Sequence, residues 1–536
     1  MPSSIKLSGY SKSAGVLALA AMMSYAALAS GAGVGKALVN GSAGQGSVSA
    51  QSGATGAVAA SLNSSSDAAY VPLPKGTLTF NKDIAPIVYD NCASCHHPGE
   101  VAPFSLLSYA DVKKRAKQIG LVTQDRTMPP WKADAGHEQF LDARRLTNQQ
   151  IGMIKQWAEE GGAEGKPADL PKPPQFTSTW KLGQPDVILQ PTEAYSLAAD
   201  GADVYRCFVI PTNYTEDRWV SAFEVHPDNR KVVHHVIAYL DTSGKARQLD
   251  AADPGPGYTS SGGGVGFNPS EGALGGWAPG NEPRHTPDGV GILLPKGADI
   301  VLQVHYHKSG KPETDLTKIA LDFCKAPVDK RLRIMPIIHW PLRIPAGDAN
   351  YQVHSDITTP ADVTLHAVMP HMHLIGKEMT VNATLPDGTV KKLVRVPDWD
   401  FNWQTTYAFK DPVKLPAGSR LDMSARYDNS AQNPTNPSNP PRPVNWGEQT
   451  TDEMCIAFAF YTVDSEQLTK GIEAKGFPNG FGAGGSGLQR QALLPLMKIF
   501  DKNGDGKLDD QERAEAAKYI RERMTVKAAA AEGATK

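Results

Sequence analysis

Residues 361–376 read ADVTLHAVMPHMHLIG, and this stretch decides the fold class of the longest part of the chain. Apolar and β-branched residues alternate with polar ones in it, which predicts a strand with one buried face. Similar runs are VVHHVIAYL at 232–240, DIVLQVHYH at 299–307 and MCIAFAFYTV at 454–463, with Gly, Pro and Asn turns between them. They are typical of an all-β sandwich, and the region from about 177 to 488 is long enough for two.

Histidines gather in these runs. They form one adjacent pair and two pairs at i and i+2: His234 with His235, His305 with His307, and His371 with His373. An i, i+2 pair points to one face of a strand, where two imidazoles can chelate a metal ion. For a single such pair, hydrogen bonding within a strand or a solvated face is the better explanation. Three pairs in one β-rich region favour metal binding, and copper suits imidazole combined with a thioether.

Four motifs together carry a family resemblance. KVVHHVIAYL, LQVHYH, MPHMHLIGKEM and TTDEMCIAF occur in this order and resemble the copper type II, ascorbate-dependent monooxygenases, the group of peptidylglycine α-hydroxylating monooxygenase and dopamine β-hydroxylase. The resemblance covers most of residues 200–465. It implies a mainly β fold of two jelly-roll-like β-sandwiches, at 177–345 and 346–486, which each hold one copper ion across a water-filled cleft.

The same resemblance implies two unlike ligand sets. The first copper ion takes His234, His235 and His305, and the second takes His371, His373 and Met454. The resemblance implies that the Met-ligated copper activates dioxygen and that the three-histidine copper delivers a second electron. The implied reaction hydroxylates a C–H bond of a small organic substrate, with ascorbate as a candidate reductant. A soft Met ligand favours Cu(I), in agreement with that role.

Three departures bear on the substrate. The peptidylglycine branch has Arg two residues before the HxH pair, and Asn and Tyr after the Met ligand. Here Met369, Ile456 and Phe458 stand at those positions. The implied pocket is therefore more apolar, which argues against a C-terminal glycine peptide and does not name another substrate.

Of the five cysteines, Cys207 and Cys324 lie at places that match an intradomain disulfide of the resembled family. The alternative is a pair of buried free thiols. Cys455 would then be unpaired, because the sequence offers no evident partner for it.

Residues 76–169 contain NCASCHHPGE, in which Cys92, Cys95 and His96 form a CxxCH motif. This spacing attaches c-type haem through two thioether bonds and supplies an axial imidazole. Half of a zinc site is the alternative, but no second CxxC or suitable His pair lies nearby. The segment resembles the class I cytochrome c family, an all-α domain with a distal Met. Met128 in TMPP is the predicted ligand, whereas Met153 lies in a predicted closing helix and is expected in its core.

Residues 501–512 read DKNGDGKLDDQE, the pattern of an EF-hand loop. The predicted calcium ligands are Asp501, Asn503, Asp505, Lys507 through its carbonyl, and Glu512. Helical patterns flank the loop, so we expect a helical EF-hand at 487–524 and a disordered tail at 525–536. An acidic helical linker is the alternative interpretation.

The N-terminus predicts export. Lys6 and Lys12 precede an apolar stretch that is too short to span a bilayer comfortably, and Ala27-Leu28-Ala29 offers a cleavage site. We expect a signal peptide at 1–29, with an uncleaved anchor as the alternative, and a flexible Gly-, Ala- and Ser-rich linker at 30–75. The expected location is the periplasm or the outside of the cell, with no membrane span after cleavage.

Composition excludes one class of function. The 536 residues carry a net charge of -2 with no basic stripe, which argues against a nucleic-acid partner. The predicted function is a copper-dependent monooxygenase that uses dioxygen and receives electrons through its haem from a redox protein or a small reductant. The alternative is an electron-transfer or copper-holding protein that does not hydroxylate.

Overall fold

The computed structural model describes residues 68–100, 102–176, 180–259, 265–266, 272–477 and 502. The expected signal peptide and most of the expected linker lie outside these residues. So do the predicted calcium ligands Asp501, Asn503, Asp505, Lys507 and Glu512. The described helices and strands all lie in one compact unit, residues 71–488. This unit is mainly β, which confirms the predicted class.

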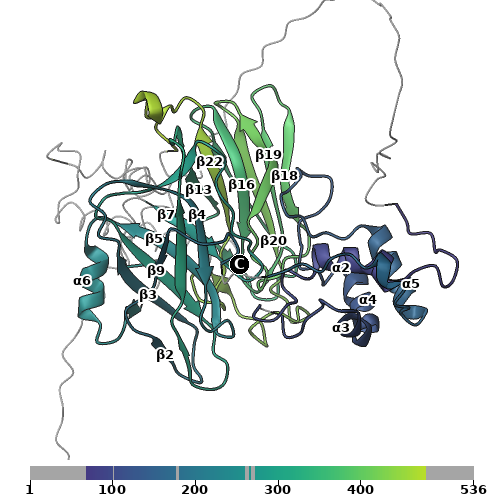
Figure 1. Ribbon diagram of the computed structural model, residues 1–536. Coiled ribbons are helices and arrows are strands. Elements are labelled where there is room, and N and C mark those ends of the chain that lie inside the picture. Colours follow the sequence, from purple (N-terminus) through teal and green to yellow (C-terminus); the bar gives the residue numbers. More distant parts are fainter. Residues whose placement is uncertain are drawn as a thin grey trace, which may run out of the picture. The chain divides into compact units, whose positions relative to one another are not determined.

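A helical segment precedes the strands (Figure 1). Its elements are η1 (Phe80–Ile84), α2 (Ala85–Asn91), α3 (Tyr109–Lys114), α4 (Ala116–Gln124), α5 (Asn148–Glu159) and η2 (Pro167–Asp169). A capping box starts α5, because the Thr147 hydroxyl accepts the Gln150 N–H and the Gln150 side chain accepts the Thr147 N–H. Phe80, Val88 and Trp157 are buried in one shared cluster, so the helices pack around a core of their own.

The first sandwich consists of two five-stranded sheets. One sheet has the order β1 (Val187–Leu189), β11 (Lys318–Phe323), β4 (Arg218–His226), β8 (Val290–Leu294) and β12 (Lys330–Arg331). The other has the order β6 (Tyr258–Thr259), β3 (Val204–Pro211), β9 (Asp299–Tyr306), β5 (Val233–Asp241) and β7 (Ala273–Trp277). Val220 and Leu321 of the first sheet share a buried cluster with Phe208, Val236 and Leu302 of the second, so the sheets pack face to face.

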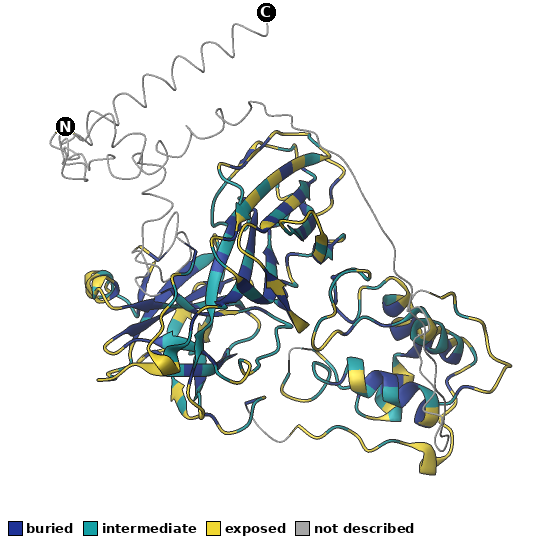
Figure 2. Cartoon of the chain, turned by 90° about the horizontal axis from the view of Figure 1, so that it is seen from above, coloured by how far each residue is buried: buried dark blue, intermediate teal, exposed yellow. Residues whose placement is uncertain are grey.

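Both faces of the second sheet are covered. Helix α6 (Lys245–Ala252) packs Ala246 against Val301 and Cys207 on the face that points away from the shared core. All eight residues of β9 are buried. Figure 2 shows dark blue, buried strands within the β-rich part of the chain. A separate two-stranded sheet pairs β2 (Tyr195–Leu197) with β10 (Glu313–Asp315).

The second sandwich consists of two four-stranded sheets. Their orders are β13 (Arg333–Ile338), β22 (Ile456–Val463), β16 (Val363–His371), β19 (Tyr407–Leu415), and β15 (Tyr351–Thr358), β20 (Arg420–Tyr427), β17 (Gly376–Thr384), β18 (Val390–Val396). Short strands β14 (Arg343–Ile344) and β21 (Val444–Asn445) pair beside them, and η3 (Leu468–Lys470) follows β22. Strand β13 places part of this sandwich before the expected boundary at 346. The expected jelly-roll-like connection stays a prediction.

The expected Cys207–Cys324 disulfide is wrong, because both thiols are free. Phe208 and Ile210 of β3 point into the core between the sheets, so Cys207 points to the opposite face, under α6. Cys324 follows β11 in the other sheet of the sandwich. The sheet itself therefore separates the two sulfur atoms. Cys455 is buried and also free.

Residues 131–141, which we name the strap, lie between α4 and α5 in sequence but pack on the second sandwich. Their backbone hydrogen bonds reach β18 and β19: Asp134 N–H to Arg395 O, Glu138 N–H to Lys392 O, and Leu141 N–H to Ala408 O. Trp131 is 8% exposed and meets Tyr407 edge to face, with ring centroids 5.2 Å apart. The expected cytochrome segment 76–169 thus contributes to the core of a β-sandwich.

Replacing Trp131 tests this packing. Trp131→Ala should lower the free energy of unfolding by about 3–5 kcal/mol, the usual loss for a large buried aromatic side chain. Leu121→Ala in α4 is the control, because Leu121 is 63% exposed. Urea unfolding of the full chain measures both. Equal stability of the two variants would contradict the strap as a structural contact.

Candidate metal centres

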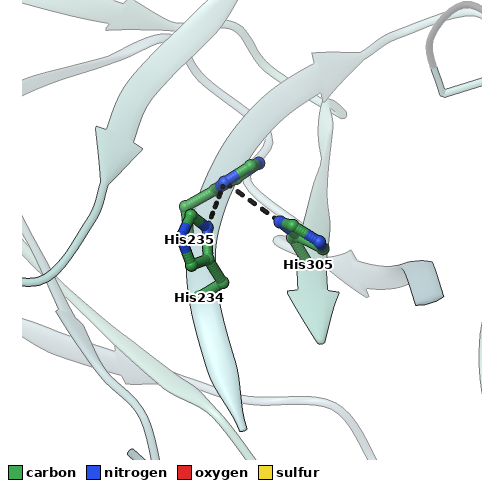
Figure 3. Close-up of side chains that lie close together, drawn as sticks. All are labelled: His234, His235 and His305. Carbon is green, nitrogen blue, oxygen red and sulfur yellow. Dashed lines mark hydrogen bonds between the residues drawn. The ribbon is translucent and has the colours of Figure 1, made fainter. Parts of the chain in front are cut away.

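The first centre lies where β5 pairs with β9. His235 is opposite His305 in the antiparallel register, and the register shifts between Val233 and His235. Neighbouring residues of a regular strand point to opposite faces, so His234 and His235 could not otherwise share a site. This bulge places one extra residue in β5 and turns both rings toward His305 (Figure 3).

The spacing of the three rings fits a metal ion. The Nδ1 atom of His235 lies 3.2 Å from that of His234 and 3.4 Å from that of His305. Two imidazole nitrogens that bind a metal such as zinc at about 2.0 Å in tetrahedral geometry lie about 3.3 Å apart. One ligand atom from each residue lies within 4.8 Å of the others. The sequence-predicted trio is thus brought together.

Burial keeps these imidazoles neutral. It lowers the pKa of His234 to about 3, and it lowers the pKa values of His235 and His305 as well. Neutral imidazole has the free lone pair that a metal ion needs. The Nε2 atom of His234 is buried without a hydrogen-bond partner, and its ring stacks on Phe401 at 4.5 Å.

Asp203, which the sequence patterns did not single out, holds His305 in place. Its Oδ2 atom lies 2.9 Å from Nε2 of His305, and Tyr205 stacks on the same ring at 4.2 Å. This carboxylate leaves Nδ1 of His305 directed at the other two rings. Asp203 also contacts His307, whose side chain is 67% exposed and lies outside the trio. Asp203 stands just before β3, where no motif marks it.

The second centre lies at the end of β16. His371 pairs with Ile456, so the residues beyond this pair bring His373 toward Met454. Nδ1 of His371 lies 2.7 Å from Gln404 Oε1, and Nδ1 of His373 lies 3.1 Å from Asp452 O. The two rings stand at 88° to each other, with centroids 5.3 Å apart. Because each Nδ1 is engaged, Nε2 is the candidate ligand atom of each ring.

Glu453 ties the parts of this second centre together. The side chain is fully buried, and it accepts the backbone N–H groups of His373, Ile375 and Met454. Burial raises the pKa of Glu453 to about 8, against the effect of these donors. One carboxyl group therefore fixes the backbone on both sides of the proposed ligand set. Glu453 lies in the motif TTDEMCIAF, directly before the predicted ligand Met454. The spacing of the motif does not indicate that this glutamate supports the site.

A cavity of about 220 Å³ lies between the two sandwiches. It is lined by His235 from the first sandwich and by His371, His373 and Met454 from the second. Met369, Ile456 and Phe458 also line it, as the apolar pocket prediction required. His235 of the three-histidine centre and the Met454 centre therefore face the same largely apolar cavity.

The helical segment carries the third predicted site. Cys92 follows α2 directly, and the N–H groups of Cys95 and His96 both donate to Cys92 O, at 3.2 and 3.0 Å. Nδ1 of His96 lies 3.1 Å from the Phe104 carbonyl, which leaves Nε2 free to bind iron. This donor set fits c-type haem. Met128 follows α4 and is partly buried, whereas Met153 packs against the helical core as expected.

Comparisons with known proteins bear on the second sandwich. A family model described as "Copper type II ascorbate-dependent monooxygenase, C-terminal domain" matches residues 347–472, which include His371, His373 and Met454. The matched family is a copper monooxygenase, which supports an oxidoreductase. A search of curated proteins found no match. No described helix is long and apolar enough to cross a membrane.

Likeness to solved structures is weak. A subviral particle of infectious bursal disease virus VP2 matches at 10% identity and a TM-score of 0.16, over 64% of this chain and 94% of that one. PNGF-II matches at 9% identity and a TM-score of 0.23, over 51% and 65% of the two chains. At such scores the likeness carries no argument.

Removing the charge of Asp203 tests its role in the first centre. Asp203→Asn should lower copper affinity there by about 10–100-fold, the usual effect of losing the partner that orients a ligating imidazole. Asp356→Asn is the matched control, because Asp356 lies 3.7 Å from His354 in an exposed pair away from both centres. Competition with a copper chelator measures the affinities. Equal affinities in the two variants would contradict the role of Asp203.

Proposed function

We propose that this chain is an exported copper-dependent monooxygenase that hydroxylates a C–H bond of a small or mid-sized organic substrate. The observation that carries the proposal is the shared cavity, which has His235 on one side and His371, His373 and Met454 on the other. The first set continues into His234 and His305. Two bound copper ions would supply two single electrons and the activation of dioxygen.

The residues around the cavity have separate tasks in this proposal. Gln404 and Asp452 hold the Nδ1 atoms of His371 and His373, so that both Nε2 lone pairs face the metal. The thioether of Met454 favours the reduced ion. Met369, Ile456 and Phe458 exclude water and accept the apolar part of the substrate. The class of substrate is therefore apolar at the carbon that reacts.

Haem, bound by Cys92, Cys95 and His96, would relay single electrons to the copper ions in this proposal. The engagement of Nδ1 of His96 by the Phe104 carbonyl supports it, because that hydrogen bond fixes the ring and its tautomer. The CxxCH motif and the expected signal peptide agree, since c-type haem is characteristic of exported bacterial proteins. A calcium ion bound by the EF-hand loop completes the proposed set of cofactors.

Replacement of Met454 separates the enzyme from a copper protein that does not hydroxylate. Met454→Ala should lower substrate-dependent oxygen uptake by at least about 100-fold, the upper range for loss of a supporting group, since a ligand itself is lost. Copper at the three-histidine centre should stay. Met369→Leu is the control, because it alters the same cavity without removing a proposed ligand. Oxygen uptake with ascorbate and a panel of apolar compounds is the measurement; full uptake in Met454→Ala would exclude the mechanism.

The distal haem ligand is tested by replacing each methionine in turn. Met128→Ala should abolish the Met-ligation signature of the haem spectrum, whereas Met153→Ala should keep it, because Met153 packs in the helical core. Spectra of protein from a host that matures c-type cytochromes provide the measurement. The reverse result would assign the ligand to Met153, and complete haem loss on acid–acetone extraction would rule out thioether attachment.

The calcium proposal rests on the loop pattern at residues 501–512. Glu512→Ala removes the bidentate carboxylate, so calcium binding should weaken strongly while copper content stays unchanged. Isothermal titration with calcium measures this, with Asp509→Ala as a milder change in the same loop. A wild-type chain without affinity at millimolar calcium would contradict the EF-hand.

A further inference from the structure

Two ion pairs dock the CxxCH loop on the first sandwich, one of them at the turn that precedes the strand with the histidine pair. Glu100 lies four residues after His96, and its Oε2 atom is 3.0 Å from a guanidinium nitrogen of Arg230. Its Oε1 atom is 3.9 Å from the Lys181 amine. Arg230 lies four residues before His234 in the sequence. The side chain of Glu100 is only 11% exposed, so this contact is largely shielded from solvent.

Trp277 lies beside the Glu100–Arg230 ion pair, at the same small cavity. It ends β7 and pairs with Val236, the residue next to His235. Cys95, Glu100, Arg230 and Trp277 line a small cavity of about 30 Å³ between the loop and the sandwich. Trp277 also lines the cavity that contains His235. Among the described residues, Trp277 alone lines both cavities.

We propose that Trp277 provides the route by which single electrons pass from the haem edge at Cys95 to the copper ion of the three-histidine centre. This inference rests on the proposed function. A haem attached through the Cys95 sulfur would have its edge at this residue. Trp277 borders both cavities, so its indole offers a route through covalently linked atoms, along which an electron moves faster than through solvent or empty space.

The step is a simple one-electron exchange. Haem iron(II) becomes iron(III) as copper(II) becomes copper(I), and no bond or proton moves. Trp277 is unchanged before and after the exchange. Glu100, Arg230 and Lys181 act as positioning residues, because they hold the CxxCH loop against the sandwich. In this proposal the three-histidine centre receives the electron first, because Trp277 pairs with Val236, the neighbour of His235.

Anaerobic stopped-flow measurement of the full-length holoprotein tests the route. Oxidised protein is mixed with one electron equivalent of dithionite, the haem α band is followed, and frozen samples report the Cu(II) signal by electron paramagnetic resonance. In the wild type the reduced haem band should decay as the Cu(II) signal of the three-histidine centre falls. Trp277→Leu should slow this decay by roughly tenfold or more, equal to about 1.4 kcal/mol of barrier.

Three variants complete the experiment. Trp277→Phe keeps a ring and should transfer faster than Trp277→Leu but more slowly than the wild type. Trp219→Leu is the matched control, because Trp219 lies on β4 of the same sandwich and lines neither cavity. Glu100→Gln should slow the transfer, and the difference from the wild type should not grow at high salt, because salt weakens the same ion pair in the wild type. The haem potential and the Cu(II) spectrum should be unchanged in the Trp277 and Trp219 variants.

The outcomes are distinct. An unchanged rate in Trp277→Leu with both metals bound would overturn the route, and if that variant loses copper, an unchanged rate in Trp277→Phe would overturn it instead. No transfer from haem to copper in the wild type would remove both the route and the haem relay. In that case ascorbate-supported oxygen uptake decides separately whether the monooxygenase proposal stands.

Discussion

The antiparallel pairing of β5 with β9 is the constraint on which the first metal centre depends. Hydrogen bonds of the ladder set His235 opposite His305, and the core residues Val236 and Leu302 oppose a shift in register because a one-residue slip would turn them out of the core between the two sheets. The bulge at His234 then costs one regular pairing but brings a third imidazole to the same side. Strand pairing in the interior thus determines ligand geometry at the cavity.

Buried carboxyl groups support the two centres in different ways. Asp203 faces imidazoles, and although burial opposes ionisation, its contacts with His305 and Thr450 keep the pKa of Asp203 well below its usual range. Glu453 faces only backbone N–H groups, and burial outweighs them. A charged acceptor orients a side chain in the first centre, whereas in the second a carboxyl group with a raised pKa fixes the backbone itself.

Alternation in the sequence predicted the strands, because a strand depends on local periodicity, whereas the two ligand sets and the apolar pocket were implied by the family resemblance. The bulge at His234 could not be predicted, since two adjacent histidines are compatible with opposite faces of a regular strand. The sequence did not reveal the supporting roles of Asp203 and Glu453, because such a role depends on contacts that only the folded chain forms. The Cys207–Cys324 bridge failed for a similar reason: α6 covers the face to which Cys207 points, and the sequence contains no sign of which face that is. The strap was assigned to the helical domain because its contacts join residues far apart in the chain.

The strap also covers two sheet edges that would otherwise be exposed. Strands β18 and β19 each end the order of their sheet, and such edges carry unpaired backbone groups that can recruit a strand from another molecule. Residues 131–141 hydrogen-bond to both strands. A second sandwich expressed without the strap would therefore have two unpaired edge strands, and we expect it to self-associate. The helical segment and this sandwich therefore depend on each other for folding. A gene fusion that moved the second sandwich to another protein would have to include residues 131–141 to keep these two edges covered.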